Sequence, residues 1–137
     1  MPKRILVVDD HAPTRALVRS VLDAEKSDRF EVVEAGTGTE CLKAFDSKGP
    51  FDIILLDVTL PDMDGFEVCR ALRSVDKQVP IVFVTAKGHL DDYAAGRAAG
   101  GDSYLVKPIA RASLRSIVGL FTTVARDREA AARAAKT

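Results

Sequence analysis

The chain has 137 residues, and its 20 lysine and arginine residues balance 20 aspartate and glutamate residues, so the formal net charge is zero. This length fits one domain of ordinary size, which buries roughly two-thirds of the surface of the unfolded chain and needs no disulfide or metal to fold. Zero net charge excludes a general electrostatic attraction to nucleic acid or to an acidic membrane surface. We therefore expect the function to reside in a local site.

Two features of the sequence predict a cytoplasmic protein without membrane insertion. No apolar run approaches the roughly 18 residues that a membrane-spanning helix requires. The basic N-terminus is followed only by the apolar residues 5–8 before two aspartates. This run is too short for a secretory signal, whose apolar segment has about 7–15 residues.

Short apolar segments and segments with helical spacing alternate along the chain. In chain order, the sequence predicts a strand at 5–8, a helix with an apolar face at 17–22, a strand at 30–34, a helix at 41–45, a strand at 53–56, a helix at 66–72, a strand at 81–84, a helix at 90–98, a strand at 104–106 and a helix at 114–124. Four of these strands are nearly continuous apolar runs, which is typical of parallel strands that helices cover on both faces. The strand at 30–34 is more mixed and suits an edge of the sheet.

This alternation predicts an α/β fold with one five-stranded parallel sheet, right-handed crossovers and helices on both faces. We expect the flavodoxin-like strand order 2-1-3-4-5, a three-layer (βα)5 arrangement whose ligand site lies at the carboxyl ends of strands 1 and 3. Residues 3–124 form the expected domain. The Ala- and Arg-rich residues 125–137 are interpreted as a C-terminal helical extension or tail. A solvated extension of the last helix is favoured over a signalling or dimerising helix, or the start of a linker.

Polar residues follow four of the predicted strands at the points where these strands end. They are Asp9 and Asp10 after the first strand, Asp57 after the third, Thr85 after the fourth and Lys107 after the fifth. Because parallel strands end at the same edge of a sheet, these side chains are expected to meet in one crevice. Carboxylates so placed repel each other by about 4 kcal/mol per close pair at an effective dielectric constant of about 20.

The charge of this cluster predicts a divalent cation. The three carboxylates and Lys107 sum to a charge of −2. Oxygen ligands without a nearby histidine or cysteine favour Mg²⁺, or Mn²⁺, over Zn²⁺. Because Mg²⁺ keeps positions open for phosphate oxygens, Asp57 is a candidate nucleophile that forms an aspartyl phosphate. The Thr85 hydroxyl and the Lys107 ammonium would then hold phosphoryl oxygens.

These residues lie in motifs that resemble the receiver domain of two-component response regulators. The motifs are Asp9-Asp10, the run 57–65 (DVTLPDMDG), Thr85-Ala86 and the run 104–108 (YLVKP), and the similarity extends over about residues 3–124. The resemblance implies that Asp57 accepts phosphate from a histidine kinase or a histidine phosphotransfer protein, with Thr85 and Lys107 in contact with the phosphoryl group. It also implies a magnesium site, whose ligands are Asp9, Asp10, Asp57 and the backbone carbonyl of Thr59.

The same resemblance implies how phosphorylation is read out. Tyr104 matches the aromatic switch position of the family. Together with Thr85 it would change a protein-binding surface formed by the fourth helix, the fifth strand and the fifth helix. The family usually has a cis peptide bond before the proline that matches Pro108, which would aim Lys107 into the site. The chain is thus expected to be a signalling receiver that catalyses only its own phosphorylation and dephosphorylation and acts on a protein target, without direct contact with nucleic acid.

Other classes of protein fit the same pattern less well. Haloacid-dehalogenase-type phosphatases also use an aspartate at a strand end, but they need a second aspartate two residues later, where this chain has Thr59. In a flavodoxin, Asp9 and Asp10 would repel the flavin phosphate. Receivers that dimerise through the fourth and fifth helices tend to carry an arginine at the position of Ile117, so a monomer or weak dimer is expected here.

Overall fold

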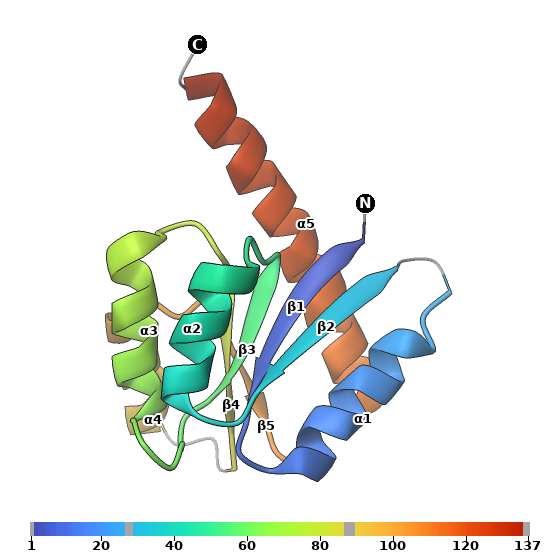
Figure 1. The fold of residues 1–137 in the computed structure, drawn as a ribbon, viewed down its shortest axis with the longest axis vertical. Helices are drawn as coiled ribbons and strands as arrows, with labels where there is room; N and C mark the ends of the chain where they lie inside the picture. The colour runs from blue at the N-terminus through green and yellow to red at the C-terminus, as the bar shows by residue number, and fades with distance from the viewer. Residues whose placement is uncertain (1, 27–28, 87–89, 136–137) are drawn as a thin grey trace.

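The computed structural model describes residues 2–26, 29–86 and 90–135, with the backbone alone for 90–92. Five strands and five helices alternate along these residues (Figure 1). The strands are β1 (Lys3–Val8), β2 (Phe30–Ala35), β3 (Ile53–Asp57), β4 (Ile81–Thr85) and β5 (Ser103–Val106). The helices are α1 (Ala12–Asp23), α2 (Gly38–Lys48), α3 (Gly65–Val75), α4 (Leu90–Ala99) and α5 (Arg111–Ala135). Each predicted element is present, in the predicted order.

The five strands of the described residues lie in one parallel sheet of order β2-β1-β3-β4-β5, which confirms the predicted topology. The register aligns the carboxyl ends of the strands, because Asp57 pairs with Val84 and Thr85 pairs with Val106. β1 ends beside β3 in the same way. The sheet therefore brings the ends of β1, β3, β4 and β5 to one edge, where the polar residues are expected to meet.

Helices cover both faces of the sheet, α1 and α5 on one face and α2, α3 and α4 on the other (Figure 1). Ile53 and Leu55 of β3 belong to the core beneath α1 and α5, and Ile54 and Leu56 belong to the core beneath the other three helices. Burial on both faces explains why the apolar runs are continuous rather than alternating. The site at the sheet edge is thus built on strands that are packed on both sides.

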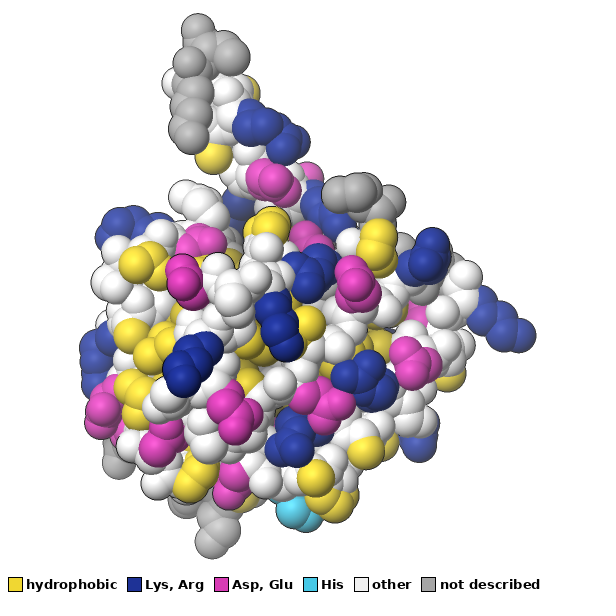
Figure 2. All heavy atoms as spheres, viewed as in Figure 1, with side chains coloured by type: hydrophobic (Ala, Val, Ile, Leu, Met, Phe, Trp, Pro, Cys, Tyr) yellow, Lys and Arg dark blue, Asp and Glu magenta, His cyan; other side chains and the backbone are white. Residues whose placement is uncertain are grey.

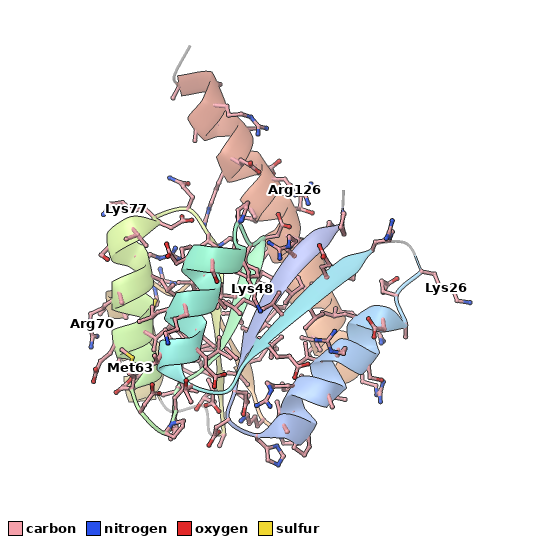
Figure 3. The ribbon with its side chains drawn as sticks, viewed as in Figure 1. Lys26, Lys48, Met63, Arg70, Lys77 and Arg126 are labelled. Carbon is pink, nitrogen blue, oxygen red and sulfur yellow. The ribbon has the colours of Figure 1, made fainter. Side chains whose placement is uncertain are left out.

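α5 continues well past the apolar stripe that ends at Val124, and its outer part projects beyond the domain (Figure 1). At the base of this extension, labelled in Figure 3, Arg126 donates to Asp52 at 2.9 Å. Arg128 donates to Asp102 at 3.0 Å. The first turn of the extension is therefore attached to the domain, where the sequence predicts solvent. Although α5 has 25 residues, neither it nor another helix of the described residues is apolar enough over a sufficient length to cross a membrane.

Removal of the residues after Arg126 is expected to lower the free energy of unfolding by less than about 1 kcal/mol, because it removes a partly exposed ion pair between Arg128 and Asp102. Asp102 keeps Arg73 as a partner at 3.0 Å. Urea unfolding of the shortened and the full chain measures the difference, and Arg128→Ala in the full chain isolates the ion pair. A loss above about 2 kcal/mol would contradict the domain boundary that we propose after residue 124.

Candidate functional site

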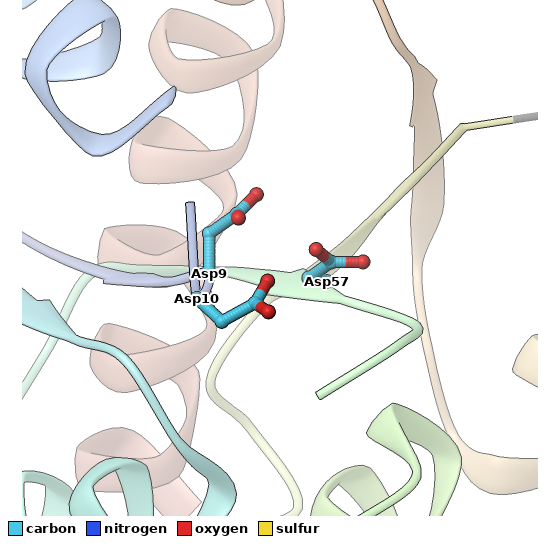
Figure 4. A group of neighbouring side chains, drawn as sticks. All are labelled: Asp9, Asp10 and Asp57. Carbon is cyan, nitrogen blue, oxygen red and sulfur yellow. The ribbon is translucent and has the colours of Figure 1, made fainter. Parts of the chain in front are cut away.

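Three carboxylates lie together at the carboxyl edge of the sheet (Figure 4). Asp9, Asp10 and Asp57 each contribute an oxygen, and these oxygens lie within 4.8 Å of one another. Asp9 and Asp57 come from the ends of the neighbouring strands β1 and β3 and are 2% and 6% exposed, whereas Asp10 is exposed. Two of the three negative charges are thus held away from water and depend on nearby cations and hydrogen-bond donors.

Lys107 pairs with both buried carboxylates. Its Nζ lies 2.8 Å from Asp9 Oδ2 and 3.0 Å from Asp57 Oδ2. Because β4 separates β5 from β3, a side chain as long as lysine is needed to span the distance. The peptide bond between Lys107 and Pro108 is cis, as the family resemblance implies. Burial by itself lowers the pKa of Lys107, but the close contacts with the two carboxylates and their negative charges outweigh it and raise the pKa.

Each oxygen of the Asp57 carboxylate accepts a hydrogen bond from the site. Oδ1 accepts a hydrogen bond from Thr59 N–H at 3.0 Å, and Oδ2 accepts one from Lys107 Nζ at 3.0 Å. Burial is the largest cause that raises the pKa of Asp57, and the negative charge of Asp9 raises it further. The hydrogen bonds from Thr59 N–H and Lys107 lower the pKa but do not outweigh these two causes. The ionised carboxylate is therefore less favourable in the fold than in water, and a further cation nearby would relieve this cost.

Asp9 has one buried oxygen without a well-formed hydrogen bond. Its Oδ1 accepts a hydrogen bond from His11 N–H at 2.8 Å. Its Oδ2 is close to Lys107 Nζ, yet it has no hydrogen bond of good geometry to the described residues. A buried acceptor beside two further carboxylates fits a hard divalent cation bound through oxygen, so the residues present suit Mg²⁺. Thr59 reaches the site through its N–H, and the role of its backbone carbonyl stays a prediction.

Thr85 ends β4, the strand next to Asp57, and is buried. Its backbone carbonyl accepts a hydrogen bond from Lys107 N–H at 2.7 Å, which ties the ends of β4 and β5 together beside the acid cluster. Contact of Thr85 with a phosphoryl group stays a prediction. Lys87 and Gly88, in the predicted loop between β4 and α4 that would follow a movement of Thr85 on phosphorylation, lie outside the described residues.

Tyr104 lies half-buried on β5, with its ring packed against α4. The ring centroid is 4.4 Å from that of Tyr93 on α4, in an edge-to-face arrangement, and 5.4 Å from that of Phe83 on β4. The hydroxyl lies against Gly96, where a Cβ would come within 2.0 Å of the Tyr104 oxygen. This position of the ring therefore requires a glycine at 96. In the sequence, a glycine inside a helix indicates only a weaker helix.

Two residues near Asp57 are important in the structure, although no sequence pattern assigned a role to either. A Cβ at Gly65 would lie 2.3 Å from the backbone oxygen of Asp57, so glycine lets α3 begin directly against the end of β3. Asp62 accepts hydrogen bonds from Gly38 and Thr39 at the start of α2. A glycine at the point where a helix begins after a loop is a sequence signal for Gly65. Asp62 has no such local signal, because its partners Gly38 and Thr39 lie 24 and 23 residues earlier in the chain.

A family model described as the response regulator receiver domain matches residues 5–119 of the chain. Among curated relatives, the DNA-binding response regulator MtrA of Mycobacterium tuberculosis (strain ATCC 25618 / H37Rv) is 44% identical over 108 residues, which are 79% of this chain and 45% of the relative. The transcriptional regulatory protein PrrA of the same organism is 40% identical over 111 residues, which are 81% of this chain and 46% of the relative. The chain thus spans about half the length of these relatives.

Solved structures share the fold along nearly their whole length. A putative response regulator from Chloroflexus aurantiacus J-10-fl is 31% identical with a TM-score of 0.82, and the match covers 90% of this chain and 99% of that chain. A CheY-like response regulator receiver domain protein from Methanospirillum hungatei JF-1 is 27% identical with a TM-score of 0.79, covering 94% of this chain and 98% of that chain. The family match includes the three carboxylates of the acid cluster as well as Thr85 and Lys107.

Proposed function

Because the chain belongs to the family of response regulator receiver domains of two-component signalling, we propose that Asp57 accepts a phosphoryl group from a histidine kinase or a histidine phosphotransfer protein. The observation that carries the proposal is the meeting of three carboxylates and Lys107 at one edge of the sheet. In this proposal a magnesium ion, or a manganese ion in its place, is held by Asp9, Asp10, Asp57 and the backbone carbonyl of Thr59.

The transfer forms a bond between an oxygen of Asp57 and phosphorus. It breaks the bond from phosphorus to the donor nitrogen, which keeps the electron pair. The hydrogen bond from Thr59 N–H orients the carboxylate during this step. Lys107 passes from Asp57 Oδ2 to a phosphoryl oxygen, and the Thr85 hydroxyl holds another. A bound magnesium ion would supply further positive charge for the phosphoryl oxygens.

Phosphorylation by a small-molecule donor tests this proposal. With acetyl phosphate and Mg²⁺, the full chain is expected to take up acid-labile phosphate, measured by intact-protein mass spectrometry. No uptake is expected in EDTA, because the buried carboxylates then repel the incoming phosphate. Equal uptake with and without a divalent cation would contradict the metal role. Absence of uptake from both acetyl phosphate and phosphoramidate in the presence of Mg²⁺ would contradict the proposed function.

We further propose that the chain acts in the cytoplasm, as a monomer or weak dimer, through a protein target that contacts α4, β5 and α5. Tyr104 borders two shallow pockets on this surface, one beside α4 with Arg97 and one beside α5 with Ile117. Direct binding of nucleic acid by these residues is not part of the proposal. Zero net charge gives the chain little attraction for a phosphate backbone. On the face that Figure 2 shows, over α1, α2 and α3, basic and acidic side chains are interspersed.

The proposed readout couples Thr85 to Tyr104. A phosphoryl oxygen at Asp57 would draw the Thr85 hydroxyl towards it, and Tyr104 would then exchange between two packings that differ by a few kcal/mol, as such switches typically do. The contact of Tyr104 with Gly96 defines one of these packings. We propose that in the other the ring swings into the space that Thr85 vacates, so that the surface offered to a target differs between the two states.

Gly96→Ala is expected to expel the Tyr104 ring from its place against α4, because the new Cβ would lie 2.0 Å from the hydroxyl oxygen. Ring signals of Tyr104 in NMR spectra, assigned with the help of Tyr93→Phe, measure the change. Gly119→Ala is the matched control, since a Cβ at this glycine of α5 meets nothing within 4 Å. It is expected to gain up to about 1 kcal/mol of stability. Unchanged Tyr104 signals in Gly96→Ala would contradict the packing described.

A further inference from the structure

Asp62, at the tip of the loop between β3 and α3, is bonded to the N-terminus of α2. Its Oδ1 accepts a hydrogen bond from Gly38 N–H at 2.8 Å, and its Oδ2 accepts hydrogen bonds from the N–H and the hydroxyl of Thr39 at 3.0 and 2.7 Å. The Thr39 hydroxyl and these amides lower the pKa of Asp62 to about 2. The side chain is exposed, yet donors from one other segment of the chain contact both of its oxygens.

Packing adds to this contact. Met63 lies against Gly38, where a Cβ would come within 2.8 Å of the sulfur and within 3.0 Å of Val68. Figure 3 shows Met63 near the adjoining ends of α2 and α3. The tip of the loop is therefore seated on α2 both by hydrogen bonds and by van der Waals contact.

The base of the same loop is closed beside Asp57. Thr59 and Asp64 pair in an isolated antiparallel bridge. Gly65 N–H donates a hydrogen bond to the Val58 carbonyl at 2.7 Å, and Thr59 N–H in turn holds Asp57. Because the base of the loop is closed and its tip is anchored, Thr59 is constrained from both sides.

The segment that Asp62 contacts also reaches the other side of the acid cluster. It continues directly from β2, where the Ala35 carbonyl accepts a hydrogen bond from Asp9 N–H at 3.0 Å. Thr37 then caps α2 by accepting a hydrogen bond from Glu40 N–H at 3.0 Å. Asp62 thus connects the loop that follows Asp57 with the loop that lies next to Asp9.

We propose that Asp62 is a positioning residue, which holds the loop between β3 and α3 in the arrangement that binds the divalent cation and presents Asp57. The inference rests on the proposed function. Asp62 does not touch the reacting atoms. When its contacts are lost, the binding of the cation must order the loop, and this entropic cost weakens the affinity. Direct partners of metal ligands typically change metal affinity about 10–100-fold, so about 3- to 10-fold is expected from this longer path.

The test compares three variants in the full chain: Asp62→Asn, Thr39→Val and the control Asp46→Asn. Thr39→Val removes one donor to Asp62 without a change of charge. Asp46 is an exposed carboxylate on α2, so its variant reports the effect of charge alone. The affinity for Mg²⁺ is measured by titration of the Thr59 amide signal in NMR spectra. The phosphorylation rate is measured with acetyl phosphate at subsaturating Mg²⁺, and the free energy of unfolding is measured in urea without metal.

Asp62→Asn is expected to raise the Kd for Mg²⁺ about 3- to 10-fold and Thr39→Val about 2-fold, with a parallel fall in phosphorylation rate. Asp46→Asn is expected to leave both unchanged. An unchanged Kd in both Asp62→Asn and Thr39→Val overturns the inference, even where stability falls. It is also overturned if Asp46→Asn matches Asp62→Asn while Thr39→Val has no effect. Failure of the wild-type chain to bind Mg²⁺ contradicts the proposed function itself, and the inference falls with it.

Discussion

Asp57→Asn is expected to take up no acid-labile phosphate under conditions in which the wild-type chain is phosphorylated. An amide oxygen lacks the charge and reactivity of a carboxylate nucleophile. The contact with Thr59 is kept, because the asparagine oxygen can still accept the hydrogen bond that Thr59 N–H donates. Intact-protein mass spectrometry after reaction with acetyl phosphate measures the uptake, and Asp46→Asn serves as a control that keeps it. Uptake at the wild-type level would falsify the assignment of Asp57 as acceptor.

The same substitution is expected to stabilise the metal-free chain at neutral pH. Burial and the charge of Asp9 raise the pKa of Asp57, so its ionised form is penalised in the fold relative to the unfolded chain. This penalty is absent at pH values below the pKa that Asp57 has in the unfolded chain, and it is complete at pH values above the pKa that Asp57 has in the fold. The advantage of Asp57→Asn in urea unfolding is therefore expected at about pH 7 in EDTA and should vanish at about pH 3. An equal advantage at both pH values would contradict an electrostatic origin.

The sheet and the site at its edge could be predicted from the sequence, because both follow from local patterns. Each central strand is buried on both faces and so appears as a continuous apolar run, and a parallel sheet then aligns the residues that come next. Asp9, Asp57 and Lys107 could be brought together from strand order alone, without knowledge of a single side-chain contact. The structure confirms this proximity.

Contacts that depend on the direction of side chains could not be predicted in this way. Asp62 is bonded to Thr39, 23 residues earlier, and the spacing of two loop residues gives no sign of it. In the sequence, Gly96 indicates only lower helix stability. The contact of the Tyr104 hydroxyl with Gly96 in the structure shows why glycine is needed there. The ion pair of Arg128 with the domain depends on the length and direction of α5.

Lys107→Ala is expected to lower the free energy of unfolding of the metal-free chain by about 2–3 kcal/mol. Removal of one member of a buried ion pair typically costs about 3–5 kcal/mol, because the remaining charge is uncompensated. The Lys107 side chain is 25% exposed, so solvent screening reduces this cost. Asp9 and Asp57 raise the pKa of Lys107 against the effect of burial. The stabilisation is therefore complete at pH values below the pKa of Lys107 in the unfolded chain, which include the neutral range. It is lost as the pH rises through the pKa of Lys107 in the folded chain.

Urea unfolding in EDTA measures the loss, with Lys43→Ala on the exposed side of α2 as a control expected to change stability by at most about 0.5 kcal/mol. Mg²⁺ is expected to restore more stability to Lys107→Ala than it adds to the wild type, because the ion replaces the missing positive charge. The double variant Lys107→Ala/Asp57→Asn is expected to recover most of the loss, since it removes one of the two charges that the lysine compensates. If the double variant is as unstable as Lys107→Ala, the stabilisation comes from packing of the lysine side chain and not from its ion pairs.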